Sequence, residues 1–129
     1  MPARIIKGMV LLMLGSSLLA CSSSGEKEAQ LEAIASHRAQ ILSAGLPIEH
    51  GPLTVMQAKA SGKVINILMI FNTANGQLPQ NLLEKSTQYY CSNNEIKTNL
   101  EQGISYEITI KNSRGQTLVE HPVSKASCE

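Results

Sequence analysis

The strongest constraint on the fold is a stretch in which apolar and polar side chains alternate without a break. Residues 104–111 read Ile-Ser-Tyr-Glu-Ile-Thr-Ile-Lys. A period of two places the apolar side chains on one face of a β-strand and the polar ones on the other. Residues 112–115, Asn-Ser-Arg-Gly, are typical of a turn, and residues 116–123 supply the return strand. The pattern predicts an antiparallel hairpin with one buried and one solvated face.

A second hairpin is expected from strands over 53–60 and 63–71, joined at Ser61-Gly62. With Ala60 opposite Lys63, one face carries Met56, Ala58, Ile65, Ile67, Met69 and Phe71. The other face carries Leu53, Val55, Leu68 and Ile70 and becomes polar toward the turn. Both faces are therefore apolar away from the turn, so the hairpin needs cover on both sides, from helices or from a partner.

Helical periodicity predicts a helix over 26–44 and another over 78–90. The apolar stripe of the first comprises Leu31, Ile34, Ala35, Ile41 and Leu42, and the candidates for burial in the second are Leu82, Leu83, Tyr89 and Tyr90. Residues 47–52 are predicted to form a connector and 72–76 a loop. The stretch 92–103 is ambiguous, with one or two helical turns indicated. The fold class is therefore α+β, an antiparallel sheet of about four strands in two hairpins, flanked by helices.

The N-terminus has the order of a secretory signal, in which a basic head is followed by a short apolar run and small residues. The apolar run is shorter than the roughly 20 residues that span a bilayer. Leu18-Leu19-Ala20-Cys21 resembles the lipobox of bacterial lipoproteins. The resemblance implies that residues 1–20 are a signal peptide and that Cys21 carries lipid.

Residues 21–26 are then a lipidated cysteine with a short tether, and residues 27–129 are long enough for one compact domain. No Asp follows the cysteine, and an Asp there would resemble an inner-membrane retention signal. The expected location is therefore the outer membrane, with the domain anchored by its lipid and facing the periplasm.

Composition argues against several classes of function. The 11 basic side chains, two of them in the signal, nearly balance the 10 acidic ones, which argues against nucleic acid as a partner. The chain has no Asp, so it has no Ser-His-Asp triad, and its three His are scattered. We expect no enzyme activity, no metal, no cofactor and no small-molecule substrate, although a His/Glu metal site assembled in space stays open. His37 and Arg38 are interpreted as solvated surface or as the edge of the stripe.

Lipidation of Cys21 would account for the odd number of cysteines. If Cys21 is lipidated, Cys91 and Cys128 remain for an oxidising periplasm. A disulfide between them is predicted, which would pin the C-terminal tail to the domain. The alternative is a redox or metal pair, for which closer spacing would be expected.

Several stretches resemble the AspS-type pilotin lipoproteins of bacterial type II secretion systems. The likeness begins at residues 43–56, Ser-Ala-Gly-Leu-Pro-Ile-Glu-His-Gly-Pro-Leu-Thr-Val-Met, and continues to Asn72. It resumes at Tyr90-Cys91-Ser92-Asn93, at residues 103–108 and 111–116, and closes with Cys128. Membership would imply a small sheet flanked by helices, which agrees with the fold expected from the residues.

The resemblance also implies a role without catalysis. Pilotins of this kind bind the C-terminal segment of the secretin subunit and use their lipid to direct it to the outer membrane for assembly. The candidate partner-binding residues are Met56, Ile67, Met69 and Phe71, since Met suits adaptable apolar surfaces; core packing is the other interpretation of the methionines. The alternative functions are a periplasmic inhibitor lipoprotein of the lysozyme-inhibitor type and a generic envelope assembly lipoprotein.

Overall fold

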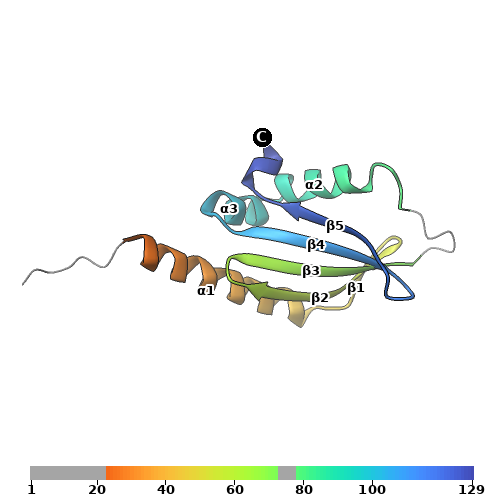
Figure 1. The fold of residues 1–129 in the computed structure, drawn as a ribbon, viewed down its shortest axis with the longest axis horizontal. Coiled ribbons are helices and arrows are strands. Elements are labelled where there is room, and N and C mark those ends of the chain that lie inside the picture. Colours follow the sequence, from red (N-terminus) through yellow and green to blue (C-terminus); the bar gives the residue numbers. More distant parts are fainter. Residues whose placement is uncertain (1–22, 73–77) are drawn as a thin grey trace, which may run out of the picture.

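A computed structural model describes residues 23–72 and 78–129 (Figure 1). The predicted signal peptide, Cys21 and most of the predicted loop over 72–76 lie outside these ranges. The elements in chain order are α1 (Ser23–Ala44), β1 (Ile48–His50), β2 (Leu53–Ser61), β3 (Val64–Phe71), α2 (Leu82–Ser92), α3 (Asn94–Gln102), β4 (Ser105–Asn112), β5 (Thr117–Val123) and a short 3-10 helix, η1 (Lys125–Cys128).

The strands form one sheet in the order β1-β2-β3-β4-β5. Both predicted hairpins are present, as β2–β3 and β4–β5, and the α+β class is confirmed. Two features were not expected. β1 adds a fifth strand inside the predicted connector, and β3 pairs with β4 in parallel. A parallel pair needs a crossover connection, which α2 and α3 supply.

The first hairpin does not have the predicted register, for two reasons. The turn lies at Gly62-Lys63, one residue later than expected, so Ala60 pairs with Ile65 and not with Lys63. In addition, β2 contains a bulge. Val55 pairs with Met69 and Gln57 with Leu68, which leaves Met56 as an extra residue between them. A shift of one residue turns the preceding side chains to the opposite face. Leu53 and Val55 therefore join Ala58 on the same face, whereas the sequence pattern separated them.

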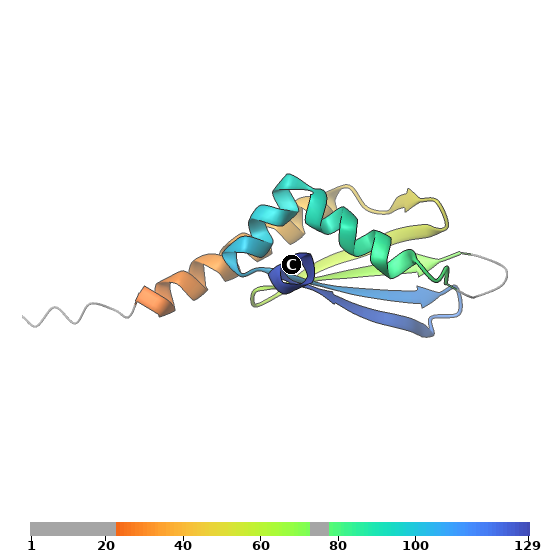
Figure 2. The same ribbon diagram turned by 90° about the horizontal axis from the view of Figure 1, so that it is seen from above.

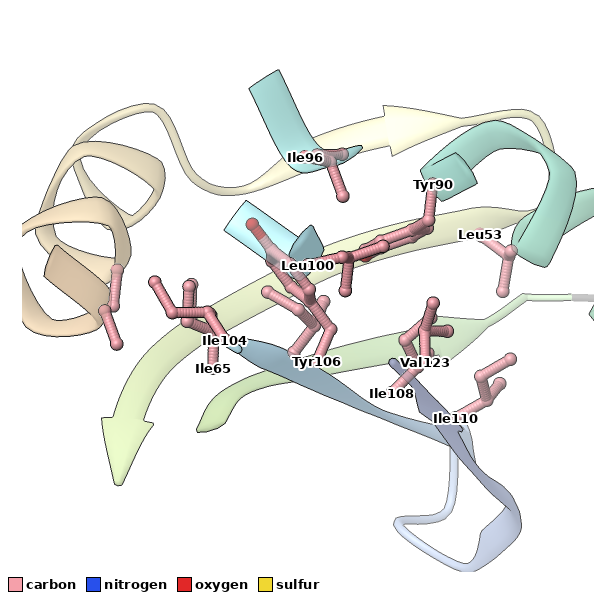
Figure 3. Packing of buried hydrophobic residues seen from close by; sticks show 14 of the residues in the cluster. Leu53, Ile65, Tyr90, Ile96, Leu100, Ile104, Tyr106, Ile108, Ile110 and Val123 are labelled. Atoms are coloured by element: carbon pink, nitrogen blue, oxygen red, sulfur yellow. The ribbon is translucent and has the colours of Figure 1, made fainter. Parts of the chain in front are cut away.

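All three helices pack on one face of the sheet (Figure 2). Many strand side chains on this face are almost fully buried; Ile65, Ile108, Ile110 and Val123 are each at most 1% exposed, as is Ile104 just before β4. Figure 3 shows how Tyr106 of β4 lies beneath Tyr90 and Leu100 of the helices. The rings of Tyr90 and Tyr106 meet edge to face, with centroids 5.1 Å apart.

The second face of the sheet carries fewer apolar side chains than predicted, because the bulge has moved two of them. Leu68 and Ile70 remain there and are half-buried. Leu68 pairs with Gln57 and Thr109, and Ile70 pairs with Thr54 and Lys111. These polar neighbours flank each apolar side chain on both sides, so the apolar surface formed by Leu68 and Ile70 does not continue onto their partners in β2 and β4.

Helix α1 contacts the sheet through small side chains. Ala35 and Ala39 are 0% and 4% exposed, and Leu31 is buried beside them. Ile34 and Ile41, which the predicted stripe included, are 38% and 51% exposed. The alanines let the helix axis approach the sheet closely, and the two isoleucines then lie beside the contact instead of in it.

Helix boundaries also differ from the sequence-based prediction. α1 begins at Ser23, inside the expected tether, because Glu, Lys and Ala in its first turns favour helix. α2 begins at Leu82, after Pro79, and the ambiguous stretch forms a complete helix, α3. The side chain of Asn93 caps α3 by accepting a hydrogen bond from the N–H of Ile96 at 3.1 Å. Of the candidates for burial on α2, Tyr90 is buried but Tyr89 is 60% exposed.

The close approach of α1 predicts a large effect of a larger side chain at position 35. Ala35→Leu adds volume where there is none to spare, so we expect the free energy of unfolding in urea to fall by about 1–3 kcal/mol. Ala33→Leu, on the exposed side of the same helix, is the matched control and should change it by less than about 0.5 kcal/mol. Equal effects of the two substitutions would contradict the packing of α1 described above.

Candidate functional site: an apolar groove

A groove of about 430 Å³ lies between the helices, above the sheet. Its floor consists of Leu53, Val55, Ala58, Ile67, Met69 and Tyr106 from β2, β3 and β4. One wall consists of Arg38, Leu42, Leu46, Ile48 and His50 from α1, β1 and the segment that joins them. The opposite wall consists of Lys85, Ser86, Tyr89, Tyr90, Asn93 and Ile96 from α2, α3 and the residue between them. The lining is thus mainly apolar, with polar groups on its walls.

Exposed apolar side chains gather at the rim of this groove. Ile48 and Tyr89 line opposite walls and are 41% and 60% exposed. Ile34 precedes Arg38 on α1 by four residues and Ile41 follows it by three. Both therefore lie on the same side of the helix as Arg38 and extend the apolar surface beyond the groove lining. An apolar patch around a concave surface is typical of a site that binds a protein or a ligand.

The charged side chains in the lining are both cationic, Arg38 and Lys85. Nη2 of Arg38 donates a hydrogen bond to Oε2 of Glu95 at 3.0 Å, which joins α1 to α3. Burial, with a smaller contribution from Tyr106 and Tyr89, raises the pKa of the Tyr90 phenol well above its ordinary value. Tyr90 is therefore neutral at physiological pH, and Arg38 and Lys85 make the groove lining positively charged.

Of the four residues predicted to bind a partner, the structure brings two into the groove. Ile67 and Met69 lie on its floor. Phe71 is 3% exposed and belongs to the core, and Met56 is 46% exposed at the bulge, outside the groove lining. The rim residues Ile48 and Tyr89 were not singled out as partner-binding. Only the tertiary fold brings these two side chains to the same groove. The adjacent Tyr89 and Tyr90 in an aromatic-poor chain could nevertheless have indicated a binding site.

The described ranges contain no arrangement of three or more His, Cys, Asp or Glu side chains that could hold a metal ion. His121 is occupied in another way, since its Nε2 lies 2.7 Å from Oγ1 of Thr87 and joins β5 to α2. In the same ranges, none of the helices has both the length and the apolar character needed to cross a membrane.

A family model of the type II secretion system pilotin, S protein, matches residues 27–128. The chain belongs to this pilotin family. The resemblance inferred from the sequence is thereby confirmed.

Individual relatives agree with membership. A pilotin of the Vibrio vulnificus type II secretion system, EpsS, is 50% identical and superimposes with a TM-score of 0.78, over 81% of this chain and 97% of that one. Pilotin AspS 2 of Escherichia coli O78:H11 is 28% identical over 99% of this chain and 93% of its own length. A cryo-EM structure of the ETEC pilotin–secretin complex AspS–GspD shares the fold, with 22% identity and a TM-score of 0.52 over 74% of this chain and 88% of that one.

The wall of the groove in this pilotin is held in place by a disulfide. Cys91, next to Tyr90 on α2, is bonded to Cys128 of η1, as predicted, with the Cα atoms 5.5 Å apart. The bond ties the C-terminal end of the chain to the end of α2, where α2 gives way to α3.

Loss of this bond should destabilise the domain. Closing a loop with a sequence separation of 37 contributes about 4 kcal/mol in the chain-entropy model, so Cys91→Ser with Cys128→Ser should lower the free energy of unfolding by about that amount. Urea denaturation of the oxidised wild type and the double variant measures the difference. The reduced wild type should match the double variant, and a reduced protein as stable as the oxidised one would refute this role of the bond.

Proposed function

We propose that this pilotin binds the C-terminal segment of a type II secretion secretin in the apolar groove, and that lipid on Cys21 directs the bound secretin to the outer membrane for assembly. The groove with exposed Ile48 and Tyr89 on its opposite walls is the observation that carries the proposal. The related fold of AspS in a complex with the secretin GspD supports the choice of partner.

An amphipathic helix suits the shape and the lining of the groove. Such a helix docks by laying its apolar face along a hydrophobic floor between two walls. Here the floor is the face of the sheet that carries Met69 and Val55, and the walls are α1 with β1 and α2 with α3. Docking would cover the exposed side chains of the rim, which otherwise face solvent at a free-energy cost that grows with their apolar area.

The binding role requires no chemistry from the chain. Pilotin activity on this proposal is capture and delivery, so the side chains in the groove act by contact and charge. We accordingly propose that the protein is not an enzyme, and that the periplasm is where its domain meets the secretin.

Groove variants test the docking site. The lipoprotein in detergent micelles is titrated with a fluorescently labelled peptide of the cognate secretin C-terminal segment, and the change in anisotropy gives the Kd. Ile48→Glu and Tyr89→Glu place a charge at exposed positions where folding is not at risk, and each should weaken binding about tenfold or more, because the charge would lose its hydration on docking.

Met56→Glu is the matched control, since Met56 is equally exposed but lies outside the groove. It should leave the Kd unchanged within about twofold, as expected for a surface substitution remote from the contact. If Met56→Glu weakens binding as much as the two groove variants, the docking surface is the one predicted from the sequence and not this groove.

The lipid is tested separately. Cys21→Ser should leave the Kd for the secretin peptide unchanged but abolish delivery. A lipidated cysteine carries two or three acyl chains that anchor the protein in a membrane, and a serine carries none. Fractionation of outer and inner membranes, followed by electrophoresis for secretin multimers, measures delivery. Normal outer-membrane multimers in cells that carry Cys21→Ser would exclude the lipid-dependent role.

A further inference from the structure

Arg38, a cation in the groove wall, has an incompletely hydrogen-bonded guanidinium. The Arg38 side chain is 19% exposed, and its guanidinium makes one ion pair, from Nη2 to Glu95. Its Nε is buried and, within residues 23–72 and 78–129, has no hydrogen-bond partner. A buried donor on a charged group that lacks a partner is unfavourable, and native proteins seldom leave one.

Glu95 does not fully compensate this charge. Its side chain is 72% exposed, and it is not part of the groove lining. An ion pair with so exposed a carboxylate contributes little and is readily exchanged. Lys85 stands on the opposite wall, and the groove lining contains no Glu to balance either cation. The groove thus presents two positive groups above an apolar floor, where low polarity strengthens their interaction with an anion.

We propose that Arg38 determines which segment the groove accepts, by binding an Asp or Glu side chain on the apolar face of the docked secretin helix. This inference rests on the groove being the docking site. A guanidinium offers five donors in a planar fork and binds a carboxylate through two parallel hydrogen bonds. Because Nε is buried in the unbound protein, the side chain must turn as the ligand carboxylate replaces Glu95 at Nη2, and the same carboxylate then accepts a hydrogen bond from Nε.

The same contact explains how the groove rejects other apolar helices. A helix without an acid would cover Arg38 and remove water from its guanidinium, with only the exposed Glu95 to balance the charge and no partner for Nε. A helix with an acid at the matching position would pair Arg38. Selection therefore comes from the penalty on the wrong partner as well as from the contact with the right one.

The experiment combines protein and peptide variants in one titration series. The lipoprotein in detergent micelles is titrated with the C-terminal peptide of the cognate secretin, and with versions in which each Asp or Glu is replaced in turn by Asn or Gln. The proteins are the wild type, Arg38→Gln, Arg38→Lys and Glu95→Gln, with Arg114→Gln, an exposed arginine of the β4–β5 turn, as the matched control.

Arg38→Gln should weaken binding by about ten- to hundredfold, the loss expected for a hydrogen-bonded charged pair. Arg38→Lys should weaken it less, and Arg114→Gln should not change it. Glu95→Gln should bind as tightly as the wild type or more tightly, because Glu95 competes with the ligand. For one peptide, replacement of the acid by its amide should weaken binding to the wild type to the level at which the unsubstituted peptide binds Arg38→Gln. The same amide-substituted peptide should bind Arg38→Gln no more weakly than the unsubstituted peptide does.

Three results with the variants and peptides named above would overturn the proposal, and a fourth concerns the peptide C-terminus. The first is wild-type affinity in Arg38→Gln. The second is an equal loss in Glu95→Gln, which would make the ion pair a structural clamp between α1 and α3. The third is equal affinity of the wild type for every acid-substituted peptide. An amidated peptide C-terminus that alone reproduced the loss would assign the carboxylate to the chain end and also refute the proposal. If Arg38→Gln fails to fold, the peptide series on the wild type decides. Failure of the wild type to bind the unsubstituted peptide would instead refute the proposed function.

Discussion

The parallel pairing of β3 with β4 determines how the rest of the domain is arranged. Its eight residue pairs, from Val64 with Ser105 to Phe71 with Asn112, join the two hairpins into a single sheet. The chain that leaves β3 must return to the start of β4, and it does so through α2 and α3 over the face on which α1 already lies. A direct antiparallel connection would have left that face to α1 alone. The groove exists because the crossover helices and α1 share a face without closing over its centre.

Sequence periodicity was sufficient for the parts of this fold that depend on local pattern. The strand over 104–111 and its return were predicted almost to the residue, because four alternating apolar side chains and a polar turn fix register and face together. For the first hairpin, the sequence pattern predicted the two strands but not their register. One extra residue at Met56 reverses the face of Leu53 and Val55, and because Met56 is itself apolar, the sequence pattern does not show where the alternation changes phase. Likewise β1 has only three residues, too few for an alternation to be recognised.

The groove itself could not be predicted in this way, because its walls come from segments distant in sequence. Ile48 and Tyr89 face each other across it only after β1 has paired with β2 and α2 has crossed the sheet. Of the residues predicted to bind a partner, Met69 and Ile67 lie on the floor of the groove. The sequence could not separate them from Phe71, which shares their face and is as buried as Ile67 but is not part of the groove lining.

Arg38 illustrates why burial and charge must be considered together. In the sequence it is a basic residue within an amphipathic helix, for which a solvated position is the ordinary expectation. Because Ala35 and Ala39 are small, α1 lies close to the sheet, and the side chain of Arg38 therefore lies in the wall of the groove. Among the described residues, only Nη2 has an acceptor, and that acceptor, Glu95, is itself exposed to solvent. The packing of two small residues thus converts a surface cation into a partly buried one, and that cation then favours a partner that brings its own negative charge.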